Sequence, residues 1–301
     1  DVYIQNFRPG TAERLGASPQ RLQGLNPALI YCSISGFGAD GPYADRPSYD
    51  SVAQALSGFL SVVVDPDRPR FLGPALADAI TGIYAAYGVL GALFERSRTG
   101  RGRLVEVSML EAMAHFAIEP FAAYFALGQV PQSSDRPRLA QAYILRTSDG
   151  GLVAIHLSSL EKFWSGLLTA LDSDRLSNDA RFSTRQGRID HYEALGAELD
   201  ALFSTHSIQH WSERLGSNDV PFAPINRICD VVRDPQVRHL GLVVPVDGAH
   251  GGDQAVRPAV QFDRQRQESV TTAPLLNEHG AAIRQALATD AQWPAIAGRT
   301  N

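Results

Sequence analysis

The sequence predicts an α/β protein of two domains. Its 301 residues suffice for two domains and a large core. Residues 1 to about 130 alternate short strand patterns with helical ones, and the linker-like stretch Gln132–Arg138 precedes further, shorter patterns. We therefore expect a large α/β domain at 1–130, a linker and small α+β domain at 131–227, and a C-terminal segment at 228–301 that returns to the large domain.

The elements of the large domain follow from its hydrophobic pattern. Apolar side chains recur at helical spacing after Asp78 and predict a face that packs against a core: Ile80, Ile83, Tyr84, Tyr87 and Leu90. This helix should end at the basic, glycine-rich turn Arg98–Gly102. Expected strands are Val2–Gln5, Leu29–Ser33 and Leu104–Val107, and expected helices are Thr11–Leu15, Tyr49–Leu60, Asp78–Glu95 and one long helix from Ser108 to about Leu127.

The second half of the chain has shorter elements. Ser207 is placed to cap a helix that Gly216 ends. For the small domain we expect strands near Tyr143–Arg146 and Leu152–Leu157, with helices near Leu160–Leu171, Tyr192–Ser204 and Ile208–Leu215. For the C-terminal segment we expect a helix at Ile228–Arg233, a strand at Leu242–Val246 and a helix near Glu278–Leu287 that pack back on the large domain.

Composition and charge narrow the class of function. The net charge is −5 with both signs interspersed, so no nucleic-acid-binding stripe is expected. Cys32 and Cys229 are too few for a disulfide framework and favour free thiols in a reducing compartment, hence a cytoplasmic protein. No apolar run of about 20 residues and no signal peptide is apparent, so no membrane association is expected. His206 and His210 are four apart but lack an acidic third ligand, so no metal site is expected.

Asp78 carries the strongest chemical signal. The stretch Gly73–Gly82 places its carboxylate at the mouth of an apolar helix. Local spacing alone favours a helix cap, because an aspartate oxygen satisfies otherwise unpaired backbone N–H groups. A carboxylate held at such a place can also act as a covalent nucleophile.

An ordered set of further motifs decides between these two readings. Upstream lie Asn6–Gly10, Ile34–Gly38 with Gly41–Tyr43, and Ser48–Ala55. The second half has Asp149–Gly150, Asp179–Phe182, Val220–Asn226, Asp234–Val237 and Pro274–His279. In this order and spacing the chain resembles the family III CoA-transferases, the group around formyl-CoA transferase and the CaiB/BaiF proteins, over almost its whole length.

The resemblance implies a fold, a partner and a reaction. The fold is a Rossmann-like large domain with a smaller α+β domain, and members form interlocked homodimers in which each chain threads a ring made by the other. Coenzyme A is a substrate and product rather than a bound cofactor, and a carboxylic acid is the other substrate. Relatives carry the first strands of the fold ahead of this point, and the chain opens on Asp1–Ile4 as a strand already under way. We therefore expect those first strands to lie outside this sequence.

The resemblance also assigns residues. Asp78 aligns with the family's nucleophile, and the coenzyme A site falls on Asn6, Phe7, Arg14, Tyr49 and Met109. Four of these have a plainer alternative: an Asx turn for Asn6, a surface ion pair for Arg14, and core packing for Phe7 and Met109. Asp50 either assists near the anhydride or caps the helix that it begins.

Three rival functions stay open. Acyl-CoA racemases of the same fold carry a His–Asp pair where this chain has Tyr49–Asp50, and a phenol replaces an imidazole poorly as an acid–base group. A thioester hydrolase would need only water at the anhydride, and a catalytically incomplete CoA-binding fragment would need no acceptor acid. The segment Arg138–Tyr143, where formyl-CoA transferase has a glycine-rich loop, contains no glycine, so the acid need not be oxalate or formate.

Overall fold

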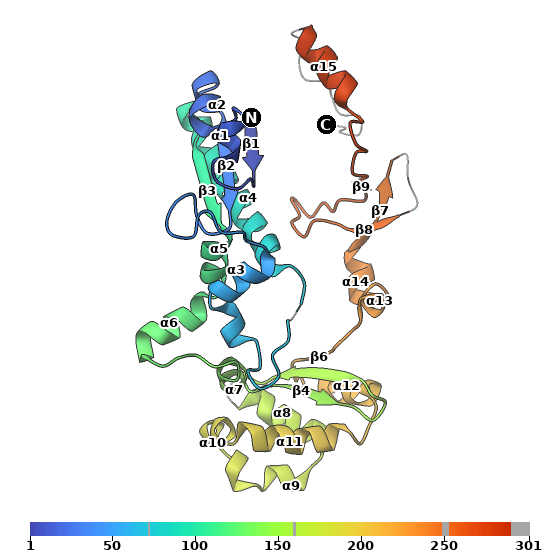
Figure 1. The fold of residues 1–301 in the computed structure, drawn as a ribbon. Helices are drawn as coiled ribbons and strands as arrows, with labels where there is room; N and C mark the ends of the chain where they lie inside the picture. Colours follow the sequence, from blue (N-terminus) through green and yellow to red (C-terminus); the bar gives the residue numbers. More distant parts are fainter. Residues whose placement is uncertain (72, 159–160, 249–252, 290–301) are drawn as a thin grey trace.

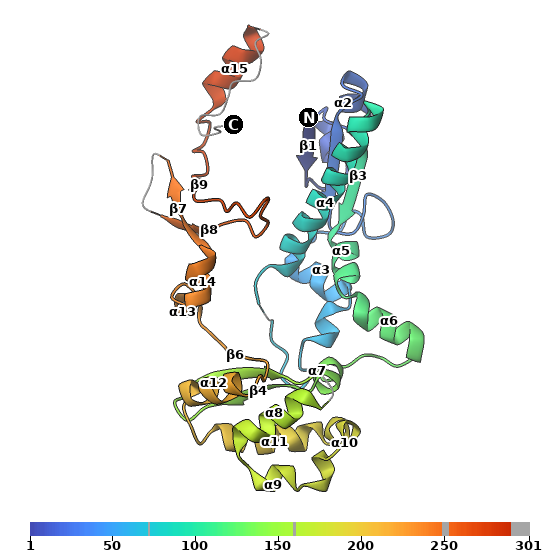
Figure 2. The same cartoon turned by 180° about the vertical axis from the view of Figure 1, so that it is seen from behind.

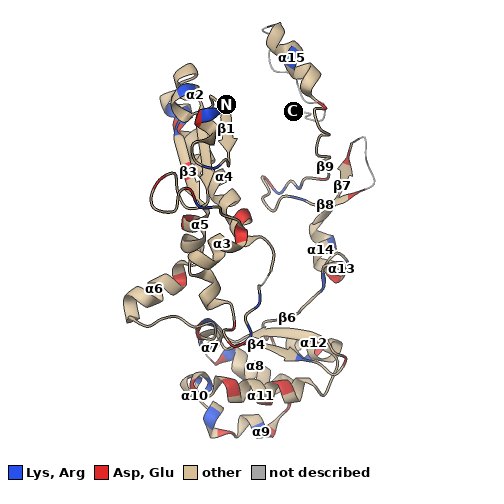
Figure 3. Ribbon diagram, in the orientation of Figure 1, with Lys and Arg blue, Asp and Glu red and all other residues tan. Residues whose placement is uncertain are grey.

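The computed structural model describes residues 1–71, 73–158, 161–248 and 253–289. Figure 1 shows three regions: the large domain, the small domain below it, and the C-terminal segment beside the large domain. Acidic and basic residues are interspersed along the described ribbon, without a continuous stripe of one sign (Figure 3).

The large domain contains a parallel sheet in the order β1 (Val2–Gln5), β2 (Ile30–Ser35) and β3 (Leu104–Ser108). Val2 pairs with Ile30, and Tyr31 pairs with Leu104. Parallel neighbours require crossover connections. These consist of α1 (Thr11–Arg14) and α2 (Pro19–Leu25) between the first two strands, and α3 (Asp50–Leu56), η1 (Phe59–Val62) and α4 (Leu76–Thr99) between the last two. The three predicted strands are confirmed to within one residue at each end except the C-terminus of β2.

Helix α4 packs through a face that matches the predicted one only in part: Ile80 is buried and Tyr84 is half-buried, as expected. Its buried residues are Ala77, Ile80, Thr81, Ala85, Val89 and Ala92. Ile83, Tyr87 and Leu90, which were expected in the core, are 69%, 74% and 65% exposed. Small side chains allow the helix to approach the sheet closely: a Cβ on Gly88 would lie 2.7 Å from Val105 Cγ1. The larger side chains are therefore left on the outside.

Length and composition alone would let α4 cross a membrane, contrary to the expectation that no segment is long and apolar enough. The helix nevertheless packs along β2 and β3 and contacts α3 and α5 (Met109–Phe116). Ala85, Val89 and Ala92 share one apolar cluster with Ile30 and Cys32 of the sheet. These contacts are those of a helix that belongs to a folded α/β domain.

The single long helix predicted after Ser108 is wrong. The chain forms α5, then breaks at Ala117 and continues as α6 (Ile118–Leu127). Pro120 has no N–H to donate to the carbonyl of Phe116, so an uninterrupted helix would lose a hydrogen bond there. The predicted linker Gln132–Arg138 likewise contains most of a short helix, α7 (Asp135–Ala140).

The small domain has its own sheet and core. Its antiparallel strands are β4 (Ala142–Arg146), β5 (Leu152–His156) and β6 (Phe222–Pro224). One apolar cluster joins the sheet to the helices through Leu145, Leu167, Phe182, Leu199 and Trp211, among others. The helices are α8 (Lys162–Leu171), α9 (Asp174–Ser177), η2 (Ala180–Phe182), α10 (Arg185–Asp190), α11 (Tyr192–Phe203) and α12 (Ile208–Ser217). The expected α+β character is confirmed.

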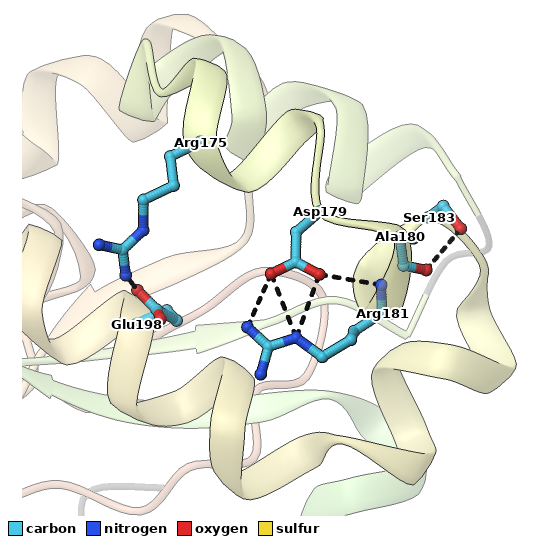
Figure 4. Close-up of polar contacts among 6 residues, drawn as sticks. All are labelled: Arg175, Asp179, Ala180, Arg181, Ser183 and Glu198. Atoms are coloured by element: carbon cyan, nitrogen blue, oxygen red, sulfur yellow. Dashed lines mark hydrogen bonds and ion pairs between the residues drawn. The ribbon is translucent and has the colours of Figure 1, made fainter.

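The motif Asp179–Phe182 has a structural role in this domain. Asp179 caps η2 by accepting the backbone N–H of Arg181 at 2.9 Å, and it also accepts Nη2 of that arginine at 2.7 Å (Figure 4). The hydrogen bond from the Arg181 side chain holds the pKa of Asp179 below its usual value. Phe182 is buried in the core. Figure 4 also shows the neighbouring ion pair between Arg175 and Glu198.

The C-terminal segment forms separate elements: α13 (Ile228–Val231), α14 (Pro235–Leu240), β7 (Val243–Asp247), β8 (Gln254–Val256), β9 (Val270–Thr271) and α15 (Gly280–Ala288). The strands pair in the order β8-β7-β9. Among the described residues, this segment stands apart from the large-domain sheet in both Figure 1 and Figure 2. The expected return of this segment to the large domain and the domain boundaries both stay predictions.

Candidate active site

A cavity of about 480 Å³ lies where β1 and β2 end and α4 begins. Its walls come from the loop after β1, the loop after β2, the start of α4 and the start of α5. Ligands of open α/β sheets bind outside the carboxyl ends of the strands, so the topology favours this position.

Five of the predicted site residues line this one cavity, although they are scattered along the sequence: Asn6, Phe7, Tyr49, Asp78 and Met109. Two others do not line it. Arg14 is exposed, and its Nη2 donates to Thr11 Oγ1 at 2.8 Å. Asp50 binds backbone groups of α4 instead of facing the cavity.

Asp78 does not cap its helix. It is the third residue of α4, and the cap position belongs to Ala75, which offers no side-chain hydrogen bond. Within the described part of the chain, the Asp78 carboxylate accepts no hydrogen bond, and the residue is exposed. The cap reading of Asp78 is therefore wrong, and its carboxylate is free at the cavity wall.

The side chain that caps the N-terminus of α4 comes from Asp50, which lies 27 residues before Ala77 in the sequence. Its Oδ1 accepts the backbone N–H of Ala77 at 2.7 Å and that of Asp78 at 3.3 Å. Its Oδ2 accepts Nε2 of Gln54 at 2.6 Å. The expected capping of its own helix is wrong, because Tyr49 holds the cap position of α3 and Asp50 is the first helical residue.

Sequence reasoning missed the two cations of the cavity, Arg8 and Arg46. Arg46 lies over the ring of Tyr43, with its guanidinium carbon 3.7 Å from the ring centroid. Arg8 stands inside the motif Asn6–Gly10, so that motif could have identified it. Arg46 carries no local signal, because only the folded loop after β2 brings it to the cavity.

The glycine loop after β2 packs tightly against Ser48, and both Gly36 and Ser48 line the cavity. A Cβ on Gly36 would lie 2.3 Å from Cβ of Ser48, and the carbonyl of Gly36 accepts the N–H of Leu110 at 3.1 Å. Glycine is required here for close packing within the protein. Ser48 Oγ is buried beside it without a hydrogen-bond partner among the described atoms.

Metal coordination is not suggested by the geometry. Across the described residues, no three His, Cys, Asp or Glu side chains gather in a way that could hold an ion. The rings of His206 and His210 stack with centroids 4.1 Å apart. Desolvation, followed by repulsion from the charges of His206 and Arg214, lowers the pKa of His210.

Comparison with known proteins identifies the family of the chain. The family model described as CoA-transferase family III matches residues 1–280. The chain is 32% identical to an acyl-CoA transferase of Fusarium pseudograminearum, with 97% of this chain and 65% of that protein covered. It is 31% identical to the succinate–glutarate CoA-transferase of Agrobacterium fabrum, with 96% and 73% covered.

Solved structures agree as well. The crystal structure of a CaiB/BaiF family protein from Brucella suis superposes with a TM-score of 0.83 at 33% identity, covering 95% of this chain and 75% of that one. This chain thus spans less than two thirds of the length of the fungal relative and about three quarters of the others. The resemblance and the fold class expected from the motifs are confirmed, and the chain belongs to CoA-transferase family III.

Proposed function

We propose that this protein transfers coenzyme A between an acyl-CoA thioester and a carboxylic acid, with Asp78 as the covalent nucleophile. The observation that carries the proposal is the free Asp78 carboxylate, which shares a cavity of about 480 Å³ with Arg8 and Arg46. Carboxylates act as nucleophiles when they are held beside the substrate, and guanidinium groups bind phosphates such as those of coenzyme A.

The proposed reaction passes through two anhydrides. An oxygen of Asp78 attacks the thioester carbon, the C–S bond breaks, and coenzyme A leaves as a thiolate. The thiolate attacks the Asp78 carbonyl carbon, which forms an enzyme thioester and frees the donor acid. The acceptor carboxylate then displaces the thiolate to form a second anhydride, and the thiolate finally removes the new acyl group and restores Asp78.

The cavity offers each part of the substrate a suitable partner. Arg8 and Arg46 supply positive charge for the phosphates, and Phe7 and Met109 supply apolar surface for the pantetheine arm or the adenine. Asn6 adds a polar side chain on the same wall. The rival racemase function is disfavoured, because the residue at position 49 is a tyrosine and not the histidine that the resemblance associates with proton exchange.

A homodimer belongs to the proposal. Asp78 is exposed in the single chain, whereas an anhydride must be kept from water. The single chain exposes 20340 Å², while a compact monomer of this length exposes about 12,000 Å². A second copy that covers the exposed apolar surface would shield Asp78 from water and would also reduce the large exposed area of each chain. A cytoplasmic location stays a prediction from the free cysteines, and the identity of the acid is open.

Intact-protein mass spectrometry after incubation with acyl-CoAs tests this proposal. We expect a covalent adduct that hydroxylamine removes in the native protein, and none in Asp78→Asn. Asp40→Asn is a matched control, because Asp40 is an exposed aspartate that does not line the cavity. Coenzyme A binding without any adduct would contradict the transferase proposal and favour a hydrolase or racemase.

A further inference from the structure

The backbone N–H groups of the first three residues of α4 all have hydrogen-bond partners. A helix ordinarily leaves these donors without partners in its own backbone. Here Leu76 donates to the carbonyl of Pro74 at 2.8 Å, and Ala79 makes the first ordinary helical hydrogen bond, to the carbonyl of Ala75 at 3.2 Å. The two donors between them, on Ala77 and Asp78, both reach Oδ1 of Asp50.

This occupancy decides what the Asp78 carboxylate can do. An aspartate in the first turn of a helix is attracted to these same N–H groups and to the positive end of the helix dipole. With Asp50 in that place, the N–H groups of Leu76, Ala77 and Asp78 are all occupied and are not available to the Asp78 side chain. Its carboxylate accordingly has no hydrogen bond among the described residues and lines the cavity.

Asp50 is itself held in place from its own helix. Gln54, one turn later on α3, donates Nε2 to Asp50 Oδ2 at 2.6 Å and is only 1% exposed. The Ala77 side of the contact is fully buried. Both carboxylate oxygens of Asp50 are therefore engaged, one by the backbone of α4 and the other by Gln54.

We propose that Asp50, held by Gln54, is a positioning residue: it caps α4 in place of Asp78 and so leaves the Asp78 carboxylate free to attack the thioester. This inference rests on the proposed function. In this role Asp50 takes part in no acid–base step and does not contact the acyl group. The alternative role, in which Asp50 assists at the anhydride, would require both.

Single-turnover acylation by an acyl-CoA, followed by intact mass, separates the two roles. In Asp50→Ala the freed N–H groups can bind the Asp78 carboxylate, so we expect acylation to slow by about tenfold or more. The dissociation constant for coenzyme A should stay within about twofold, because Asp50 does not line the cavity. In Asp50→Asn the amide oxygen can still accept both N–H groups, and most of the rate should return.

Two further variants keep the test interpretable if Asp50→Ala folds poorly. Gln54→Met releases Asp50 Oδ2 but leaves the cap, and should slow acylation by a smaller factor at unchanged coenzyme A affinity. Asp234→Ala removes a matched cap elsewhere, in which one aspartate oxygen accepts Gln236 N–H at 2.8 Å and Val237 N–H at 3.1 Å. It should acylate at the wild-type rate.

The outcomes distinguish this inference from the proposed function. No adduct in the wild-type protein contradicts the proposed function itself. A wild-type adduct with equally fast acylation in Asp50→Ala, or with Asp50→Asn as slow as Asp50→Ala, overturns the positioning role and leaves the nucleophile in place.

Discussion

Asp50 accepts the backbone N–H of Asp78 at 3.3 Å, although 28 residues separate the two aspartates. One carboxylate thus performs the capping that the sequence suggested for the other. Local spacing alone offers both roles, helix cap and nucleophile, to Asp78. The contact assigns the cap to Asp50 and leaves Asp78 available as the nucleophile.

The first prediction concerns the cavity cation Arg46. We expect Arg46→Ala to weaken coenzyme A binding by about tenfold, because a hydrogen bond to a charged group contributes about 1.5–3 kcal/mol. Isothermal titration calorimetry with coenzyme A and with pantetheine, which lacks the phosphates, measures this. Pantetheine affinity should not change.

Two other arginines serve as controls for Arg46. Arg14 is bonded to Thr11 outside the cavity, and Arg98 lies near the far end of α4 over Phe94. Alanine at either position should leave coenzyme A affinity unchanged. Weaker binding in Arg14→Ala would restore the assignment that the resemblance made for Arg14, and unchanged affinity in Arg46→Ala would contradict the assignment made from the cavity.

The second prediction concerns the tight contact at Gly36. Alanine there would place a Cβ 2.3 Å from Cβ of Ser48, and overpacking of this kind costs about 1–3 kcal/mol. We expect a lower free energy of unfolding and weaker coenzyme A binding, measured by urea denaturation and calorimetry. Gly24→Ala is the opposite case, since α2 leaves open space at that position, and it should be stabilising by about 0.4–1 kcal/mol. Wild-type stability in Gly36→Ala would show that the loop can move aside.

The third prediction concerns the pH dependence of the small domain. Arg181 lowers the pKa of Asp179 from its ordinary value of 3.8. The ionised Asp179 carboxylate therefore stabilises the folded protein in full at pH values above its ordinary pKa. This stabilisation is lost as the pH falls through the lower pKa of the folded state. We expect Asp179→Asn to lower the urea midpoint at pH 7, and the difference from wild type to shrink in strong acid.

Asp190→Asn is the control for this effect, because the Asp190 carboxylate accepts only from the neutral amide of Gln186. It should have little influence at either pH. A midpoint difference for Asp179→Asn that stays constant down to strong acid would mean that the contact acts through packing and not through charge.

The fourth prediction concerns the exposed face of α4. Ile83, Tyr87, Leu90 and Phe94 lie along one side of this helix and are exposed in the single chain. If a second copy covers this face, Tyr87→Glu should give monomers with an unchanged far-ultraviolet circular dichroism spectrum. Light scattering after gel filtration measures the mass, and the matched Gln209→Glu on the small domain should stay dimeric. A monomeric wild-type protein would contradict the dimer.

The strands of the large domain could be predicted because β1, β2 and β3 are short apolar runs between turn residues. The packed face of α4 could not, because hydrophobic periodicity favours large side chains, whereas Ala85 and Ala92 make the close contact with the sheet. The large apolar side chains Ile83, Tyr87 and Leu90, which usually prefer burial, lie on the exposed face of α4 instead.

The site itself was predictable only in part. Asp78, Asn6 and Tyr49 stand in recognisable motifs, and the structure brings them to one cavity. The contacts of Asp50 with Ala77 and Asp78 join distant parts of the sequence, so local spacing could not reveal them. Arg46 reaches the cavity only through the path of the loop after β2.

Peptide mapping of the hydroxylamine-treated adduct tests the central claim most directly. Hydroxylamine converts an enzyme thioester into a hydroxamate at the residue that carried it, and it opens an aspartyl anhydride at either of its two carbonyl carbons. We expect the hydroxamate on Asp78, in the peptide that begins α4, after incubation with an acyl-CoA. A hydroxamate on Asp50 or on any other carboxylate, with Asp78 unmodified, would contradict the assignment of Asp78 as the nucleophile.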